Sequence, residues 1–511
     1  STIMVRCPLF LIYASVLCSV VAETPLWNQF RGPNGSGVAE HCKPPVAPSR
    51  SNRAWSVAVP PGHSSPVLSA ERLFLTAVDQ EELVTIALDK ASGELIWRAK
   101  CPPAKREKVH ATSSPAASTP TVDGDFLYVY FGSFGLLCYD FEGSTRWSKA
   151  IPTPRSLYGM STCPIIHKDL VILVLDDENN LPDSKLKRSK MIALSKHTGA
   201  LVWETARPFH RSGWSTPMIW THDQGQDLVV LGHQRLNGYD PDTGVEKWHV
   251  NGFSRETIAI PVAGNGYLFA SAAMLGGVSD DQPDVEPFWR SLLPFDTNRD
   301  SKLERSEMKG HFTFPLRPNL PLGHPGFGIP MPKDDAGIKR RYDGMMRSWD
   351  KDKDGFVTRE EFLSNMTFNR GKPNLMAIRP GGQGELGESH VAWRLHKNIP
   401  EVPSPLFHDN RLYLVRDGGV MSAIDATNGK TLYRKRLGAT GQYSPSPILA
   451  NEHVYVFSGQ GVLTVISAGD DFEIVHQYDF AETIAGTPAM DDNTLYVRTA
   501  KELVAFRDQL N

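Results

Sequence analysis

Two windows of the sequence carry acidic and amide side chains at the spacing that a calcium ion requires. Each has an oxygen-bearing side chain at positions 1, 3 and 5 and a glutamate at position 12, while the residue at position 7 contributes its main-chain carbonyl. Alternate side chains of such a loop point inward and surround Ca²⁺ with oxygen atoms. The predicted ligands are Asp296, Asn298, Asp300, Lys302 and Glu307 in the first loop, and Asp350, Asp352, Asp354, Phe356 and Glu361 in the second.

The residues around the two windows favour a paired helical module. Helical patterns flank both loops, and Leu303 and Val357, at position 8 of each loop, are expected to pair as a short two-stranded link. Position 6 is Gly355 in the second loop but Ser301 in the first, and a non-glycine residue at positive φ costs about 1 kcal/mol. The first site is therefore expected to be weaker. The windows resemble the EF-hand family as a complete pair, and the alternative is a pair of solvated acidic turns without metal.

The rest of the chain repeats a Ser/Thr-Pro signature. Consecutive signature prolines lie 41 to 54 residues apart, except for an interval of 144 residues between Pro261 and Pro405. The short spacing is typical of four-stranded propeller blades, and the long one indicates an insertion of roughly 100 residues. The residues that precede the prolines are Ser65, Thr119, Cys163, Thr216, Ile260, Ser404, Ser446 and Thr487.

Within the repeats, an acidic turn that ends in glycine is followed four residues later by an aromatic residue. Large rings at one fixed position of the outermost strand predict packing between neighbouring blades. The last repeat lacks its fourth strand, and residues 54–58 match that strand, so the two ends of the chain are expected to share one blade. The repeated aromatic residues are Trp97, Trp147, Trp203, Trp248, Trp393 and Tyr433.

These patterns predict an all-β eight-bladed β-propeller with four-stranded blades and an inserted α-helical EF-hand domain. The repeated Asp-x-x-x-Gly-x-x-x-Trp pattern and the opening Trp-Asn-Gln-Phe-Arg-Gly-Pro-Asn-Gly of residues 27–35 resemble the PQQ-like, quinoprotein-type β-propeller repeat family of exported bacterial proteins. The resemblance implies the fold and says little about activity, because many members are scaffolds without cofactor. The expected segments are a signal peptide at 1–22, propeller at 23–279, the EF-hand pair at 280–387 and propeller at 388–511.

The N-terminus predicts export. Arg6 precedes an apolar stretch at residues 9–22, which is too short to cross a bilayer and is typical of a signal peptide. The alternative is a buried N-terminal strand. No other apolar run is long enough for a membrane helix, so no membrane span is expected. Export would leave Cys42, Cys101, Cys138 and Cys163, whose disulfide pairing stays open.

Residues just before the signatures are expected to line the mouth of the central channel. Arginines beside a tryptophan could hold an anionic aromatic ligand such as PQQ by charge-assisted bonds and stacking, and the alternative is a polar rim without ligand. A quinoprotein dehydrogenase normally has two adjacent cysteines below the quinone, and this sequence has none. The candidate cofactor-binding residues are His63, Tyr158, Arg211, Trp214 and Arg255.

The sequence therefore favours a binding role over an enzymatic one, and no catalytic residue is predicted. With 54 basic and 57 acidic residues and a net charge of -3, the chain lacks the positive charge of a nucleic-acid-binding protein. The predicted function is that of an exported calcium-binding scaffold or interaction module with protein or glycan partners on a propeller face. The alternatives are a periplasmic PQQ-dependent oxidoreductase acting on alcohols or sugars and a sugar- or peptide-binding propeller.

Overall fold

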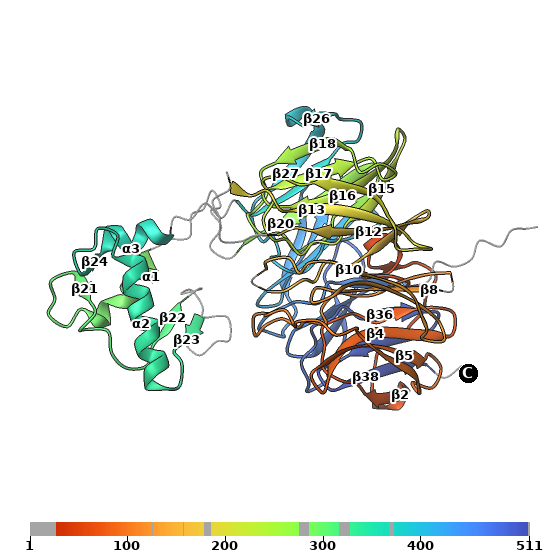
Figure 1. Ribbon diagram of the computed structural model, residues 1–511, viewed down its shortest axis with the longest axis horizontal. Coiled ribbons are helices and arrows are strands. Elements are labelled where there is room, and N and C mark those ends of the chain that lie inside the picture. The colour runs from red at the N-terminus through yellow and green to blue at the C-terminus, as the bar shows by residue number, and fades with distance from the viewer. Residues whose placement is uncertain are drawn as a thin grey trace, which may run out of the picture.

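The alternating apolar residues of each repeat form one antiparallel sheet, and eight such sheets build a β-propeller (Figure 1). The prediction of eight four-stranded blades is confirmed. The predicted signal peptide, residues 1–22, lies outside the described residues. The computed structural model describes residues 27–124, 126–156, 158–177, 185–274, 286–315, 328–366 and 372–508.

The blades follow one another along the chain, and the first strand of each is the innermost. Blade one comprises β3 (Val67–Leu68), β4 (Arg72–Asp79), β5 (Glu82–Asp89) and β6 (Leu95–Lys100). Blade two comprises β7 (Thr121–Asp123), β8 (Phe126–Phe131), β9 (Gly135–Asp140) and β10 (Thr145–Ala150). Blade three comprises β11 (Ile165–His167), β12 (Leu170–Leu175), β13 (Lys190–Ser195) and β14 (Leu201–Ala206). Blade four comprises β15 (Met218–His222), β16 (Gly225–Gly232), β17 (Arg235–Tyr239) and β18 (Glu246–Asn251). Blade five comprises β19 (Val262–Gly264), β20 (Tyr267–Ala272), β25 (Asn374–Ile378) and β27 (Val391–Leu395). Blade six comprises β28 (Leu406–His408), β29 (Arg411–Arg416), β30 (Val420–Asp425) and β31 (Thr431–Arg436). Blade seven comprises β32 (Ile448–Ala450), β33 (His453–Phe457), β34 (Val462–Ser467) and β35 (Ile474–Asp479). Blade eight comprises β36 (Ala489–Asp491), β37 (Thr494–Arg498), β38 (Glu502–Arg507) and β2 (Arg53–Ala58).

The Ser/Thr-Pro signature has a structural role, because its residues form a chain of hydrogen bonds around the propeller axis. The Ser65 N–H donates to Thr119 Oγ1 over 2.9 Å, and the Thr487 N–H donates to Ser65 Oγ over 2.9 Å. Ile260 has no hydroxyl, so it cannot accept the equivalent bond from blade four. The other links run from Thr119 to Cys163, Cys163 to Thr216, Ile260 to Ser404, Ser404 to Ser446 and Ser446 to Thr487.

The aromatic residue of an outer strand packs onto the glycine turn of the next blade, as its fixed position predicts. Trp97 lies over Gly143, where an added Cβ atom would come within 2.7 Å of the indole. The Trp97 indole N–H donates to the Phe141 carbonyl over 2.7 Å. Only glycine leaves room for the ring, which explains why the turn and the tryptophan recur together. The same pair of contacts is made by Trp55, Trp147 and Trp393.

Trp248 is an exception, because the fifth blade lacks the turn onto which it would pack. Its ring lies against Gly238 of its own blade, and its indole N–H donates to Asp227 Oδ2 over 2.7 Å. The third and fourth strands of blade five are instead joined by residues 379–390, which include β26 (Gly384–Glu385) and the short helix η5 (Glu388–His390). β26 pairs in parallel with the outer edge of β18.

Both ends of the chain contribute to the eighth blade. β2 follows the short helix η2 (Arg50–Asn52) and pairs antiparallel with β38, so an N-terminal strand completes a blade whose other three strands are C-terminal. This is the closure that the incomplete last repeat predicts. Pairing of the last blade with an N-terminal strand leaves no open edge at which the ring could separate.

The segment before β2 crosses the centre of the ring. Asn28 exchanges two hydrogen bonds with β7 of blade two, and Asn34, in the short helix η1 (Pro33–Gly35), does the same with β15 of blade four. β1 (Val38–Ala39) pairs in parallel with β32 of blade seven. The buried guanidinium of Arg31 donates to the carbonyls of Gly35 and Pro405 over 2.9 and 2.8 Å. The opening motif therefore ties distant blades together.

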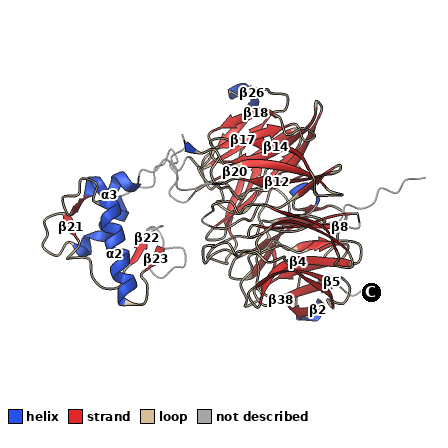
Figure 2. Ribbon diagram, viewed as in Figure 1, coloured by secondary structure: helices blue, strands red, loops and turns tan. Residues whose placement is uncertain are grey.

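The insertion interrupts blade five between its second and third strands. These strands, β20 and β25, pair with Ala272 opposite Asn374. The propeller thus resumes at Asn374, before the end of the predicted 280–387 segment, and β25 and β26 belong to the propeller. Figure 2 shows α1–α3 gathered in one body beside the strands of the propeller. This body contains α1 (Glu286–Leu292), η4 (Leu293–Phe295), α2 (Asp335–Trp349), α3 (Arg359–Met366) and the strand pairs β21 (Lys302–Glu304) with β24 (Phe356–Thr358) and β22 (Thr313–Pro315) with β23 (Gly328–Pro330).

The four cysteines left open by the sequence are free thiols in this structure. Three of them, Cys42, Cys138 and Cys163, are buried, and Cys101 is half-buried. None of the described helices is both long and apolar enough to cross a membrane.

Candidate functional site

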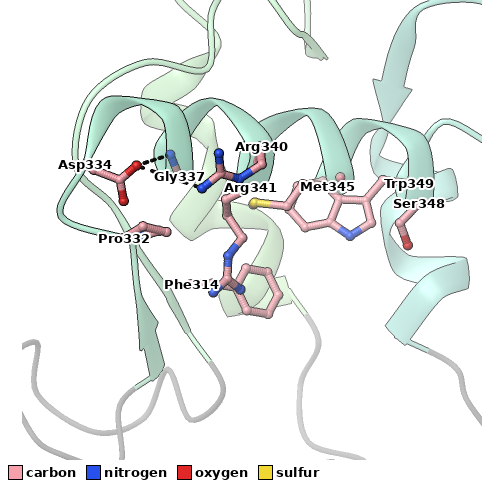
Figure 3. A pocket seen from close by; sticks show the side chains of 10 residues that line it. Phe314, Pro332, Asp334, Gly337, Arg340, Arg341, Met345, Ser348 and Trp349 are labelled. Atoms are coloured by element: carbon pink, nitrogen blue, oxygen red, sulfur yellow. Dashed lines mark hydrogen bonds and ion pairs between the residues drawn. The ribbon is translucent and has the colours of Figure 1, made fainter.

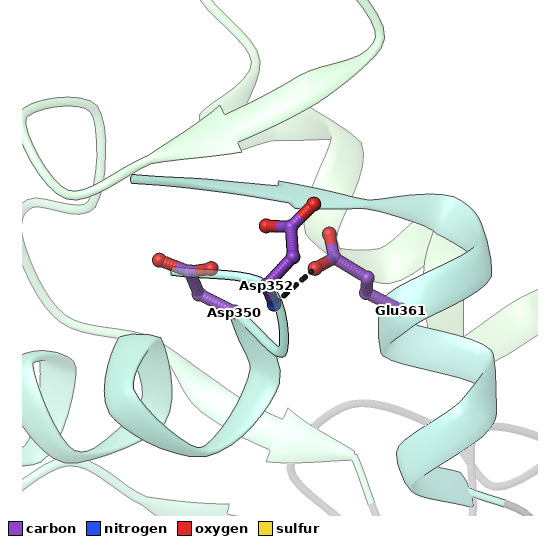
Figure 4. Close-up of side chains that lie close together, drawn as sticks. All are labelled: Asp350, Asp352 and Glu361. Atoms are coloured by element: carbon purple, nitrogen blue, oxygen red, sulfur yellow. Dashed lines mark hydrogen bonds between the residues drawn. The ribbon is translucent and has the colours of Figure 1, made fainter. Parts of the chain in front are cut away.

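The second acidic loop brings three carboxylates together (Figure 4). Oxygen atoms of Asp350, Asp352 and Glu361 lie within 4.8 Å of one another. In the described part of the chain, no other group of three Asp, Glu, His or Cys side chains converges in this way. Asp350 Oδ1 is shielded from solvent and accepts no hydrogen bond. Because a shielded anionic oxygen without a donor is unfavourable unless a cation pairs with it, the arrangement fits a bound metal ion.

The backbone of the second loop holds these carboxylates in place. The Gly355 N–H donates to Asp350 Oδ2 over 3.0 Å, and the Thr358 N–H donates to Glu361 Oε2 over 2.9 Å. Gly355 has a φ of 92°, a conformation that glycine adopts without a steric penalty. The hydrogen bond from Thr358 holds the pKa of Glu361 below its ordinary value. The glutamate is therefore an anionic oxygen donor at neutral pH.

The first loop forms the same hydrogen-bond network, but its side chains are less suited to a cation. The Ser301 N–H donates to Asp296 Oδ2 over 3.0 Å, and the Glu304 N–H donates to Glu307 Oε2 over 3.2 Å. Ser301 adopts a φ of 65°, the strained conformation that its position in the loop predicts. Asn298 supplies a neutral amide at a position where the second loop has a carboxylate. The first loop thus offers less negative charge and a less favourable turn.

The two loops are joined as a pair. Leu303 lies opposite Val357 in the β21–β24 sheet, which confirms the predicted pairing of these residues. Both are fully buried in a core that includes aromatic side chains from α1, α2 and α3. Lys302 and Phe356, the residues predicted to contribute main-chain carbonyls, begin the two strands, and the Lys302 Nζ atom lies 5.1 Å from the Phe356 ring centroid. The two loops therefore share one strand pair and one apolar core.

A cavity of about 600 Å³ lies along α2 (Figure 3). Apolar side chains of Phe314, Met345 and Trp349 line it, and Arg340 and Arg341 are at its exposed rim. Asp334 also lines the cavity, and its carboxylate lies 3.9 Å from the Arg340 guanidinium, so the rim carries both signs of charge around an interior that suits an apolar group. This feature requires the folded insertion, because its wall comes from both α2 and the strand β22.

The residues predicted for the channel mouth fall into two places. Tyr158 and Trp214 are in edge-to-face contact, with ring centroids 5.3 Å apart. The backbone N–H of Trp214 donates to the carbonyl of Thr257, which lies two residues after Arg255. Tyr158, Trp214 and Arg255 therefore belong to one neighbourhood. His63 lies elsewhere, beside the buried Arg498 of blade eight. Burial and the Arg498 guanidinium both lower the pKa of His63.

Trp214 and Arg211 do not fit the role of a quinone platform. Trp214 is 7% exposed and Arg211 is 3% exposed. The indole N–H of Trp214 donates to the Gly159 carbonyl over 2.8 Å. A stacked quinone needs an accessible ring face, and this ring is covered by the protein itself. The geometry of these residues therefore does not match the predicted PQQ site.

Glu107, in the segment between β6 and β7, has unusual surroundings that no sequence pattern predicts. Its Oε1 atom is shielded from solvent and has no hydrogen-bond partner, and the same is true of the Tyr130 hydroxyl. Burial raises the pKa of Glu107 to about 7. Residue 107 lies outside the repeat signatures and strand patterns, so no signal in the sequence marks it.

The closed ring of eight blades, with hydrogen-bonded signatures and tryptophans on glycine turns, defines a PQQ-like β-propeller. The chain belongs to the family described as outer membrane protein assembly factor BamB, whose model matches residues 48–181, 80–273 and 385–511. These matches cover most of the propeller and leave out the body formed by α1–α3.

Solved structures share the fold at low sequence identity. BamB from Moraxella catarrhalis is 11% identical, with a TM-score of 0.51 over 90% of this chain and 98% of that chain. The quinohemoprotein alcohol dehydrogenase from Comamonas testosteroni is 13% identical, with a TM-score of 0.53 over 96% and 82%. A europium-containing methanol dehydrogenase is 10% identical, with a TM-score of 0.53 over 95% and 99%. No curated protein matches the chain in sequence. At such identities the likeness shows the fold alone.

Proposed function

We propose that the protein is an exported calcium-binding β-propeller that acts as a scaffold or interaction module. The convergence of Asp350, Asp352 and Glu361 on one point carries this proposal. Carboxylate and carbonyl oxygens are the ligands that Ca²⁺ prefers, whereas nitrogen or sulfur ligands would favour a transition metal. The glycine turn and the paired strands β21 and β24 support an EF-hand pair.

In the proposed second site, calcium pairs with Asp350 Oδ1, the shielded carboxylate oxygen that accepts no hydrogen bond. The second site uses Asp350, Asp352, Asp354, both oxygens of Glu361 and the Phe356 carbonyl. The first site uses the corresponding groups of Asp296, Asn298, Asp300, Glu307 and Lys302. Bound cations neutralise the acidic loops, so they stiffen the insertion and stabilise the apolar core between the helices.

A structural use of calcium agrees with export. Extracellular modules bind calcium with dissociation constants of roughly 10⁻⁴ to 10⁻³ M, which keeps them occupied without signalling. The apolar stretch after Arg6 and the description of the family as an outer membrane assembly factor support an exported location. The insertion would then be held in one conformation and presented beside the ring to a protein or glycan.

Calcium titration of wild-type protein and of an Asp350→Asn/Glu361→Gln variant tests the proposal. The wild type should bind calcium in calorimetry and melt at a higher temperature in calcium than in chelator. The variant should lose most of this shift, because two oxygen donors become neutral. Asp335→Asn, an exposed change in the first turn of α2, is the matched control and should keep it. An equal shift in all three proteins would refute the second site.

A PQQ-dependent oxidoreductase acting on alcohols or sugars is the alternative function. The structural likeness to quinoprotein dehydrogenases supports it at the level of the fold. The covered ring of Trp214 and the absence of adjacent cysteines in the sequence argue against it. Saturable quenching of tryptophan fluorescence by micromolar PQQ, in saturating calcium, would favour the oxidoreductase. A flat titration would favour the binding role.

A further inference from the structure

Phe209 combines two unusual properties in the loop between blades three and four. Its side chain is 56% exposed, and it is the only aromatic residue among the exposed large hydrophobic side chains of the described chain. Its φ is 70°, and no other aromatic residue in the described ranges has a positive φ. A bulky residue in this conformation is strained, and such strain persists only where the surrounding structure enforces it.

A buried ion pair enforces the conformation of this loop. The fully buried guanidinium of Arg207 donates to both carboxylate oxygens of Asp176, over 2.7 and 2.9 Å, and to the Tyr239 hydroxyl over 2.5 Å. On the other side of Phe209, the Ser189 hydroxyl donates to the His210 carbonyl over 2.7 Å. The chain is thus held two residues before Phe209 and one residue after it, so less backbone freedom is lost when the loop binds a partner.

Basic residues lie in the segment to which Phe209 is hydrogen-bonded. The Phe209 N–H donates to the Leu186 carbonyl over 3.2 Å, so the backbone of Phe209 lies beside the segment that carries the exposed Lys185 and Lys187. The Arg188 side chain is 50% exposed and lies 3.3 Å from Asp177. We call Phe209 with Lys185, Lys187 and Arg188 the Phe209 patch. It combines one exposed aromatic side chain with two exposed lysines and with Arg188, whose guanidinium is paired with Asp177.

We propose that the Phe209 patch binds an acidic segment of a partner protein that carries one bulky apolar side chain. The cationic side chains attract and orient the acidic segment, while the ring of Phe209 covers its apolar residue. Insertion into a lipid surface needs several protruding apolar side chains, and Phe209 is the only exposed large hydrophobic residue described in this loop. This inference rests on the proposed role as an interaction module and names the chemistry of its partner.

Phe209→Gly separates binding from folding. Glycine adopts a φ of 70° without strain, so the variant should melt at the same temperature as the wild type or higher. Lys187→Glu reverses one charge of the patch. Val245→Gly, which removes another exposed apolar side chain, and Lys430→Glu, an exposed change in blade six, are the matched controls.

The probe is a random peptide display library selected on the mature protein in calcium, followed by fluorescence anisotropy with the enriched peptides. We expect these peptides to carry Asp and Glu around one Phe, Leu or Trp. Their affinity should fall about tenfold or more in Phe209→Gly and in Lys187→Glu, and stay unchanged in both controls. Enrichment of neutral or basic peptides, or equal affinity for all variants, would overturn the proposal.

Two further experiments distinguish a protein partner from a membrane surface, and the Phe209 patch from the calcium site. Binding to vesicles that contain phosphatidylglycerol, dependent on Phe209 and without peptide binding, would overturn the proposal in favour of a membrane surface. The Asp350→Asn/Glu361→Gln variant should bind the enriched peptides like the wild type, because the Phe209 patch belongs to the propeller. Loss of peptide binding in Phe209→Gly with calcium binding intact would support the patch, whereas absent calcium binding in the wild type would refute only the calcium site.

Discussion

Glu107 is a half-buried residue whose carboxyl group changes its charge near neutral pH. Its pKa in the folded protein, about 7, lies above its ordinary value of 4.5. The folded state therefore binds more protons than the unfolded chain between these values, and stability falls as the pH rises from 4.5 to 7. We expect Glu107→Gln to raise the free energy of unfolding at pH 8 by about 1 to 3 kcal/mol and to change it little at pH 4. Urea unfolding at both pH values measures this difference.

The exposed Glu94→Gln is the control for this prediction, because it makes the same chemical change at the surface. It should alter the stability at neither pH. If Glu107→Gln keeps the loss of stability between pH 4 and pH 8 seen in the wild type, another group is responsible for it.

Position 6 of each acidic loop sets the strain that calcium binding must accommodate. Ser301 has a φ of 65° and Gly355 a φ of 92°, so only the first loop carries the non-glycine penalty. Ser301→Gly should remove about 1 kcal/mol of strain and tighten calcium binding at the first loop about fivefold. Gly355→Ser should weaken the second loop by a similar factor. Calorimetric titration of both variants compares the loops, and an unchanged affinity in both would contradict the role of this position.

At the scale of the elements, blades are joined by tryptophans that require glycine beneath them. Gly143 has a φ of 89° and supports the ring of Trp97, whereas Gly266 has a φ of 78° and no atom within 4 Å of an added Cβ. Gly266→Ala should cost only backbone strain, about 1 kcal/mol. Gly143→Ala should cost about 2 to 4 kcal/mol, because the methyl group also displaces the indole. Denaturant unfolding measures both, and equal losses would show that the contact with Trp97 contributes nothing.

The repeated elements could be predicted from the sequence, because each one obeys a local rule that recurs. The signature hydroxyls, the glycine turns and the closing strand β2 all follow from residue types at fixed spacing. The predicted insertion includes β25, because the interruption separates this strand from β20 and a glycine-rich stretch follows it. Trp248 packs against its own blade because blade five lacks the glycine turn on which its ring would otherwise lie. No property of Trp248 itself indicates this.

The site residues likewise divide into those that a local pattern predicts and those that distant segments bring together. The carboxylates of the second loop converge because their positions lie within one short loop, so their spacing along the chain fixes their spacing in space. The channel mouth joins residues from different blades, and there the sequence predicts one group that includes His63, whereas the structure places His63 beside Arg498 of blade eight. Phe209 and Glu107 owe their properties to a backbone angle and to burial by distant segments, which no local pattern reveals.

At the scale of the whole molecule, the insertion interrupts the chain between two paired strands of blade five. Ala272 lies opposite Asn374 in the β20–β25 pair, and Figure 1 shows α1–α3 as a body apart from the blades. A two-residue Asn-Gly turn closes such an antiparallel pair. Replacement of residues 273–373 by Asn-Gly should therefore leave a folded propeller.

This shortened protein locates the calcium response in the molecule. It should melt at the temperature of the intact protein in chelator, since the blades keep their hydrogen-bonded ring and their docked tryptophans. Added calcium should no longer raise that temperature, because both acidic loops are gone. A calcium shift that persists would place a cation inside the ring and revive the quinoprotein alternative. Failure to fold would show instead that the insertion supports the fifth blade, so the two results lead to different accounts of what the inserted body does.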